Sequence, residues 1–85
     1  MSQDFTQKLD KLHRSILLLE SPTIRRDLTV MYKHCTELNS RLSSELVNCR
    51  RLQKLTPKYE EIAQNLHESI QNLDNYLVYG LLSGS

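Results

Sequence analysis

Helix-breaking residues occur at only a few places in this chain. The only prolines are Pro22 and Pro57, and no glycine precedes Gly80. Each proline follows a hydroxyl residue, Ser21 or Thr56, as expected for a helix N-cap before a proline at the first helical position, where the missing N–H costs nothing. The same capping explains both Ser/Thr-Pro pairs without phosphorylation. The chain is therefore predicted to form three helices, over residues 5–20, 22–55 and 57–79.

Apolar residues recur at spacings of three and four in all three segments, which predicts amphipathic helices with a coiled-coil seam. Asp4 is the expected cap of the first helix. In the second helix the pattern passes through Cys35 and shifts after Leu42 to Leu46 and Cys49, which resembles a stutter. The predicted seam comprises Leu9, Leu12, Ile16, Leu19, Ile24, Leu28, Met31, Leu38, Leu42, Leu46, Leu52, Tyr59, Ile62, Leu66, Ile70, Leu73 and Leu77.

The predicted fold is all-α, with residues 1–85 as a single helical domain. Eighty-five residues with 39% hydrophobic content can bury only one modest core. Two or three long amphipathic helices are expected in an extended helical hairpin or coiled-coil arrangement. The spacing from Leu55 to Tyr59 keeps the seam in phase across Pro57, so a kinked rod is an alternative to the hairpin.

The lengths of the predicted helices indicate a need for partner chains. If both proline points are turns, the first helix covers the first half of the second helix and the third covers the other half. Most cross-sections would then hold only two helices, which leaves the seam half open to water. A half-exposed seam would lose on the order of 10 kcal/mol of the free energy gained by burying apolar surface, which is comparable to the stability of a domain this size. The seam is therefore predicted to be a partner interface.

The C-terminal segment 76–85 is a second predicted docking surface. Residues 76–82 are apolar on every side of a helix, and an exposed patch of this kind usually marks an interface. Gly80 is expected to end the third helix. The alternative is that this segment folds back onto the core of the chain. The predicted docking residues are Tyr76, Val78, Tyr79, Leu81 and Leu82.

No residue pattern indicates catalysis, a cofactor or a metal. His13, His34 and His67 lie in different segments, so they lack the clustered spacing of a zinc site. Cys35 and Cys49 would lie about 21 Å apart on one straight helix, too far for a disulfide, and their places on the apolar stripe indicate small hydrophobes. There is no glycine-rich phosphate loop. We therefore expect a protein that is not an enzyme and has no cofactor or small-molecule substrate.

The charge balance and the absence of a long apolar run limit the compartments and partners. The formal net charge is +1, so nucleic-acid binding is not expected, and a local basic group is interpreted as a solvated helix flank. No run approaches the ~20 apolar residues that span a bilayer, and no signal peptide is apparent. The expected location is the cytoplasm or the nucleus, without secretion. The basic group is Arg41, Arg50, Arg51, Lys54 and Lys58.

The predicted function is that of a non-catalytic structural or adaptor subunit. It would contribute coiled-coil helices to a larger hetero-oligomeric complex, of the kind found at kinetochores, on the cytoskeleton or in vesicle and organelle trafficking. One alternative is a small helical chaperone that shields an aggregation-prone partner, for example in a bacterial secretion system. Another is a homodimeric coiled-coil scaffold. The partners, helix orientation and stoichiometry stay open at this stage.

Overall fold

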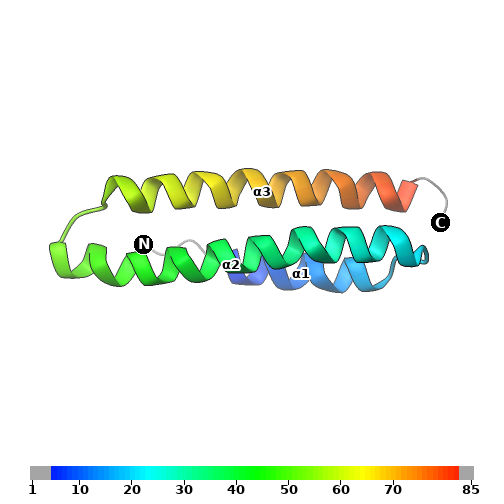
Figure 1. The fold of residues 1–85 in the computed structure, drawn as a ribbon, viewed down its shortest axis with the longest axis horizontal. Coiled ribbons are helices and arrows are strands. Elements are labelled where there is room, and N and C mark those ends of the chain that lie inside the picture. The colour runs from blue at the N-terminus through cyan, green and yellow to red at the C-terminus, as the bar shows by residue number, and fades with distance from the viewer. Residues whose placement is uncertain (1–4, 83–85) are drawn as a thin grey trace.

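The computed structural model describes residues 5–82, which form three α-helices joined by short turns (Figure 1). The helices are α1 (Phe5–Leu17), α2 (Pro22–Leu52) and α3 (Pro57–Leu82). α2 and α3 form a long antiparallel hairpin, and α1 folds back along the first half of α2. The molecule measures 49 × 18 × 16 Å. The predicted all-α extended hairpin is confirmed, and the kinked rod is not the observed geometry.

The two hydroxyl residues before the prolines cap helices as predicted. The Ser21 hydroxyl accepts a hydrogen bond from the backbone N–H of Ile24 at 3.3 Å, and Pro22 stands in the first turn of α2. The Thr56 hydroxyl accepts from the backbone N–H of Tyr59 at 3.1 Å. Each cap satisfies a donor that the first helical turn would otherwise leave unpaired.

α1 ends at Leu17, three residues before its predicted end. The chain tightens there, because the N–H groups of Leu18 and Leu19 donate to carbonyls only three residues back, each at 3.1 Å. Nη1 of Arg25 then donates to the carbonyl oxygen of Leu19 at 2.8 Å, which helps to hold the turn between α1 and α2. Asp4, the expected cap of α1, lies outside the described residues.

α2 ends at Leu52 rather than at 55, because Gln53 adopts the left-handed conformation with φ 58° and ψ 36°. The Gln53 N–H donates to the Arg50 carbonyl at 3.2 Å, and the Lys54 N–H donates to the Cys49 carbonyl at 3.1 Å. This pair of bonds is a Schellman motif, which usually has glycine at the left-handed position. The sequence pattern missed this helix end because glutamine occupies that position.

Gly80 does not terminate α3, which continues to Leu82, so this prediction was wrong. Gly80 is buried inside the last turns of the helix. A β-carbon added there would lie 3.3 Å from Cγ2 of Ile24 and 3.7 Å from Cδ2 of Leu19. The missing side chain therefore allows α3 to approach the start of α2 and the turn before it closely.

The core runs along the whole hairpin, because α3 lies beside α2 over nearly its full length (Figure 1). α1 contacts both α2 and α3, so one half of the molecule is a three-helix bundle. In the other half, next to the turn between α2 and α3, the described residues belong to those two helices only. The buried hydrophobic side chains are 0–8% exposed: Leu9, Leu12, Ile16, Leu19, Leu28, Cys35, Leu38, Leu42, Cys49, Tyr59, Ile62, Leu66, Ile70, Leu73 and Leu77.

This burial contradicts the expectation of a half-open seam. The prediction placed α1 and α3 over different halves of α2, but α3 is 26 residues long and returns past α1. Even in the two-helix half, the side chains of Leu42 and Ile62 are only 5% exposed. A partner along the seam was expected because an open seam would lose burial energy. The chain closes the seam itself, so this loss does not occur.

Candidate protein interface

The predicted seam is used inside the chain, so its assignment as a partner interface is corrected. Most of its members are buried between the helices of the single chain, where no partner can reach them in this conformation. Ile24, Met31 and Leu46 are partly buried against the same core. Leu52, at the end of α2, is 44% exposed because the helix stops there and the chain turns away.

The stutter predicted in α2 is absent from the buried positions. Leu42, Glu45 and Cys49 are buried at spacings of three and four, whereas Leu46 is only partly buried. The seam therefore keeps its regular period through Glu45. A search for apolar residues alone skips Glu45 and assigns the neighbouring Leu46 to the seam.

The predicted C-terminal docking residues are exposed in the structure. Their exposed fractions are 59% for Tyr76, 49% for Val78, 74% for Tyr79, 50% for Leu81 and 80% for Leu82. Between them, Leu77 and Gly80 face the core, so the segment packs on the chain through one side only. Residues 83–85 of the predicted docking segment lie outside the described residues.

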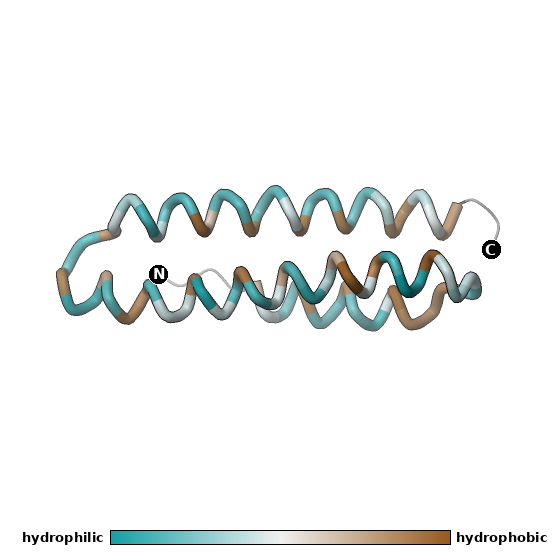
Figure 2. The backbone as a smooth tube through the Cα atoms, viewed as in Figure 1, coloured by the Kyte–Doolittle hydropathy of each residue, from teal (hydrophilic) through white to brown (hydrophobic). Residues whose placement is uncertain are grey.

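The turn between α1 and α2 adds two exposed leucines at the same end of the molecule. Leu17 is 58% exposed and Leu18 is 77% exposed. Figure 2 shows the hydrophobic residues of this turn and of the last turn of α3 at one end of the bundle. We call the set of Leu17, Leu18, Tyr76, Val78, Tyr79, Leu81 and Leu82 the apolar end.

A groove of about 350 Å³ enters one side of the apolar end. Tyr76 and Tyr79 of α3 form one wall, and Ile24 and Met31 of α2 contribute to the other, with Gly80 between the helices. Among the described residues that line it, Asp27 is the only charged one. This apolar hollow can receive a bulky side chain of another protein.

The opposite end of the hairpin contains a buried polar cluster. The Thr56 hydroxyl donates to Oε2 of Glu45 at 2.7 Å, and Nδ2 of Asn48 donates to the same oxygen at 3.2 Å. The Thr56 N–H points to Sγ of Cys49 at 3.5 Å. Glu45 and Thr56 are only 9% and 8% exposed. The cluster therefore ties α2 to the start of α3.

Hydrogen bonding sets the charge state of this cluster. The bond from Thr56, followed by that from Asn48, lowers the pKa of Glu45, and the positive charge of Lys58 adds a smaller effect in the same direction. The carboxylate therefore stays ionised and accepts both bonds at neutral pH. In the core, burial raises the pKa of the Cys35 thiol, which keeps that cysteine protonated as a small hydrophobic group.

The other candidate groups stay apart in the structure. Among residues 5–82, no three His, Cys, Asp or Glu side chains are placed to hold a metal ion. His13 instead stacks on Tyr32, with ring centroids 4.6 Å apart, and helps to hold α1 on α2. The five residues of the basic group are exposed. Within the described chain, no helix combines the length and apolar content needed to cross a membrane.

Comparisons of the chain with protein-family models, with curated proteins and with solved structures found no match. The surface chemistry of the chain itself is therefore the basis for inferring a function.

Proposed function

We propose that this protein is a non-catalytic structural or adaptor subunit that joins a larger helical complex through its apolar end. The single observation that carries the proposal is the contrast in burial between the seam and this end. The seam is covered by the chain's own helices, whereas seven large apolar residues gather uncovered where α1 and α3 end. Exposed apolar surface of this kind is costly in water and is typical of interfaces.

The shape of the apolar end favours a helical partner. The groove between Tyr76 and Met31 lies between two antiparallel helices, and a third helix can place its side chains in such a groove. Tyr76 and Tyr79 offer large rigid side chains with a polar tip, the type of residue that often dominates binding energy at interfaces. The proposed cellular settings are those of cytoplasmic or nuclear assemblies on the cytoskeleton, at kinetochores or in trafficking.

Site-specific photo-crosslinking in the native source tests this proposal. A photoreactive phenylalanine analogue would replace Tyr79 in one variant and Glu61, an exposed residue of the same helix, in a matched control. We expect a discrete crosslinked protein with the probe at position 79 only. Equal products at both positions, or none at position 79, would contradict an interface at the apolar end. A product containing two copies of this chain would identify the homodimeric scaffold instead.

The lifetime of the crosslinked complex separates the subunit from the chaperone alternative. A structural subunit stays with its partner, whereas a chaperone releases its client and rebinds another. Dilution of a labelled complex into excess unlabelled chain would measure this exchange. Retention of the label supports the subunit, and rapid loss supports the chaperone.

A further inference from the structure

The turn between α2 and α3 combines positive charge with exposed leucines. Residues 50–58 include four basic side chains and no acidic one. Leu52 and Leu55 lie among them and are 44% and 58% exposed. The four basic side chains are exposed as well. We call this set the basic tip, and it comprises Arg50, Arg51, Leu52, Lys54, Leu55 and Lys58.

The basic tip stands at one end of the 49 Å long molecule, opposite the apolar end (Figure 1). Arg50 and Arg51 occupy the last turn of α2, and Lys58 lies in the first turn of α3. Glu60 and Glu61 come after Lys58 and so lie farther along α3. Among the described residues, the exposed charges closest to the turn are therefore positive.

Hydrogen bonds fix the backbone of the turn. The N–H groups of Gln53 and Lys54 donate to carbonyl oxygens of α2 at 3.2 and 3.1 Å. The Thr56 hydroxyl donates to the buried carboxylate of Glu45 at 2.7 Å. These bonds hold the chain on both sides of Leu55. The basic tip is therefore formed before binding, which limits the ordering cost of association.

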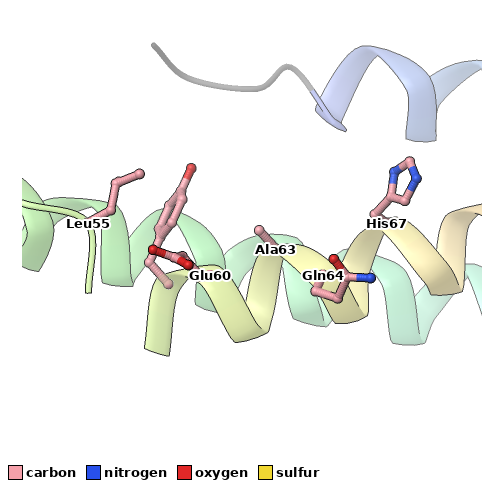
Figure 3. A pocket seen from close by; sticks show the side chains of 6 residues that line it. Leu55, Glu60, Ala63, Gln64 and His67 are labelled. Atoms are coloured by element: carbon pink, nitrogen blue, oxygen red, sulfur yellow. The ribbon is translucent and has the colours of Figure 1, made fainter. Parts of the chain in front are cut away.

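The hollow beside Leu55 has only one helical wall. Figure 3 shows Leu55 on the turn before α3, next to a hollow of about 310 Å³ that follows one side of that helix as far as His67. Apart from Leu55, the described residues that line it all belong to α3. A peptide helix binds in a groove with two walls, whereas apolar side chains on a projecting turn can enter a flat surface. The shape therefore favours a surface as the partner.

We propose that the basic tip binds the surface of a membrane that contains anionic lipids. The four cations would lie at the level of the lipid headgroups, and Leu52 and Leu55 would enter the boundary between the headgroups and the acyl chains. The affinity of such a peripheral contact grows with the buried apolar area and with the attraction to anionic lipids. The contact is independent of the proposed role of the apolar end, which stays available to a protein partner at the other end of the molecule.

The leucines distinguish a membrane from a nucleic acid. Contacts to phosphates would account for the four cations, but they would leave Leu52 and Leu55 in water. Proteins that bind single strands usually add aromatic side chains on which bases stack. Tyr59, the aromatic residue next to the turn, is only 8% exposed. An anionic bilayer complements both the cations and the leucines.

Sedimentation with lipid vesicles tests the electrostatic contribution. The full chain would be mixed with phosphatidylcholine vesicles that contain about one-third phosphatidylserine, or with phosphatidylcholine alone. We expect saturable binding to the anionic vesicles only, weakened by added salt. Lys54→Gln should lower the affinity about fivefold, which is the contribution of one basic residue near an anionic surface.

Lys33→Gln is the matched control for charge. It removes the same charge from an exposed site of α2, about 28 Å from the end of the helix at 1.5 Å per residue. This distance exceeds the Debye length at physiological salt, so the vesicle affinity should change by less than about twofold.

A tryptophan reporter tests the insertion of the leucines. The chain has no tryptophan, so Leu55→Trp introduces a single one at the basic tip. Val30→Trp places one at a 64% exposed position of α2 and is the matched control. Anionic vesicles should shift the emission of Leu55→Trp to shorter wavelength, and brominated acyl chains should quench it. We expect neither effect for Val30→Trp, and circular dichroism checks that both variants keep their helices.

Several outcomes would overturn the proposal. Equal binding to both kinds of vesicle, or none to either, would do so. Equal effects of Lys54→Gln and Lys33→Gln would mean a general attraction of charge. Equal quenching in the two tryptophan variants would mean that the chain does not bind through its tip. Quenching in Leu18→Trp instead of Leu55→Trp would make the apolar end the membrane contact. Duplex DNA that displaces the vesicles, with an affinity unchanged by Leu55→Ser, would make a nucleic acid the partner.

Discussion

Where α1 lies on the hairpin, three helices share a core that is mostly leucine and isoleucine. Beside the turn between α2 and α3, two helices bury a glutamate, a threonine and a cysteine together with Leu42 and Ile62. Both halves are buried to a similar degree. In the first half, α1 covers the side of the hairpin with apolar side chains. In the second half, a hydrogen-bonded carboxylate fills a core position that a large aliphatic residue would otherwise occupy.

The spacing of apolar residues therefore does not determine how many helices pack around a stretch of the chain. Glu45 occupies a core position, and the cost of burying its carboxylate is offset by the Thr56 and Asn48 donors. The three-helix half should therefore respond to the loss of packing volume. The two-helix half should respond to the loss of hydrogen bonds and to pH.

The largest effect is expected from Leu73→Ala in the three-helix half. Leu73 is fully buried, so truncation removes apolar contacts and leaves a cavity, at a cost of about 3–4 kcal/mol in the free energy of unfolding. Chemical denaturation followed by circular dichroism measures it. Gln71→Ala, at an exposed site of the same helix, should change stability by less than about 0.5 kcal/mol. If Cys49→Ala cost as much as Leu73→Ala, the two halves would not differ in kind.

A smaller effect is expected from Thr56→Val, which keeps the shape of the side chain but removes its hydroxyl. The change deletes the cap of α3 and leaves Glu45 without its shorter bond, so we expect a loss of about 1–2 kcal/mol. Thr36→Val removes an exposed hydroxyl bond within α2 and is the matched control. Amide hydrogen exchange should show faster opening near the hairpin turn. Uniform acceleration in all three helices would argue against a local role.

The pH dependence of stability tests the ionised state of Glu45. Hydrogen bonds hold the pKa of the folded carboxyl below its ordinary value, so its contribution is present above that ordinary value, near pH 4, and is lost as the pH falls through the folded pKa. The stability difference between the wild type and Glu45→Gln should therefore shrink on acidification from pH 7. Unfolding curves at several pH values measure it, and a constant difference would show that the charge has no role.

The smallest effect is expected from Gln53→Gly, and it should be stabilising. Gln53 has φ 58°, a conformation that glycine adopts without the steric cost of a β-carbon, so the gain should be about 0.5 kcal/mol. Gln71→Gly, inside α3, should instead lose about 1 kcal/mol. Thermal unfolding compares the two. Destabilisation by both glycines would mean that the left-handed turn does not limit stability.

Local rules predicted the helices, but not how far they overlap. The hydroxyl-proline pairs marked the starts of α2 and α3, because a cap depends on a few neighbouring residues. Leu28 and Leu66 were recognisable as core by their spacing. That spacing cannot show whether the side chains that cover these leucines belong to the same chain. The overlap of α3 with α1 depends on tertiary packing, which a local pattern does not show.

The candidate surfaces were predictable only in part. The apolar end followed from the run that includes Tyr76 and Tyr79, since residues apolar all round a helix cannot all face one neighbour. Glu45 was missed because a periodicity count treats glutamate as surface, and only its spacing of three and four from Leu42 and Cys49 marked it as core.

Sedimentation equilibrium combined with circular dichroism over the same concentration range tests the central claim that one chain closes its own seam. We predict a helical content that does not change on dilution, with a mass that approaches 10.0 kDa. Self-association through the apolar end would raise the mass at high concentration but leave the helical content constant. Helical content that falls together with the mass on dilution would show that the seam is closed by another chain, and would contradict the account.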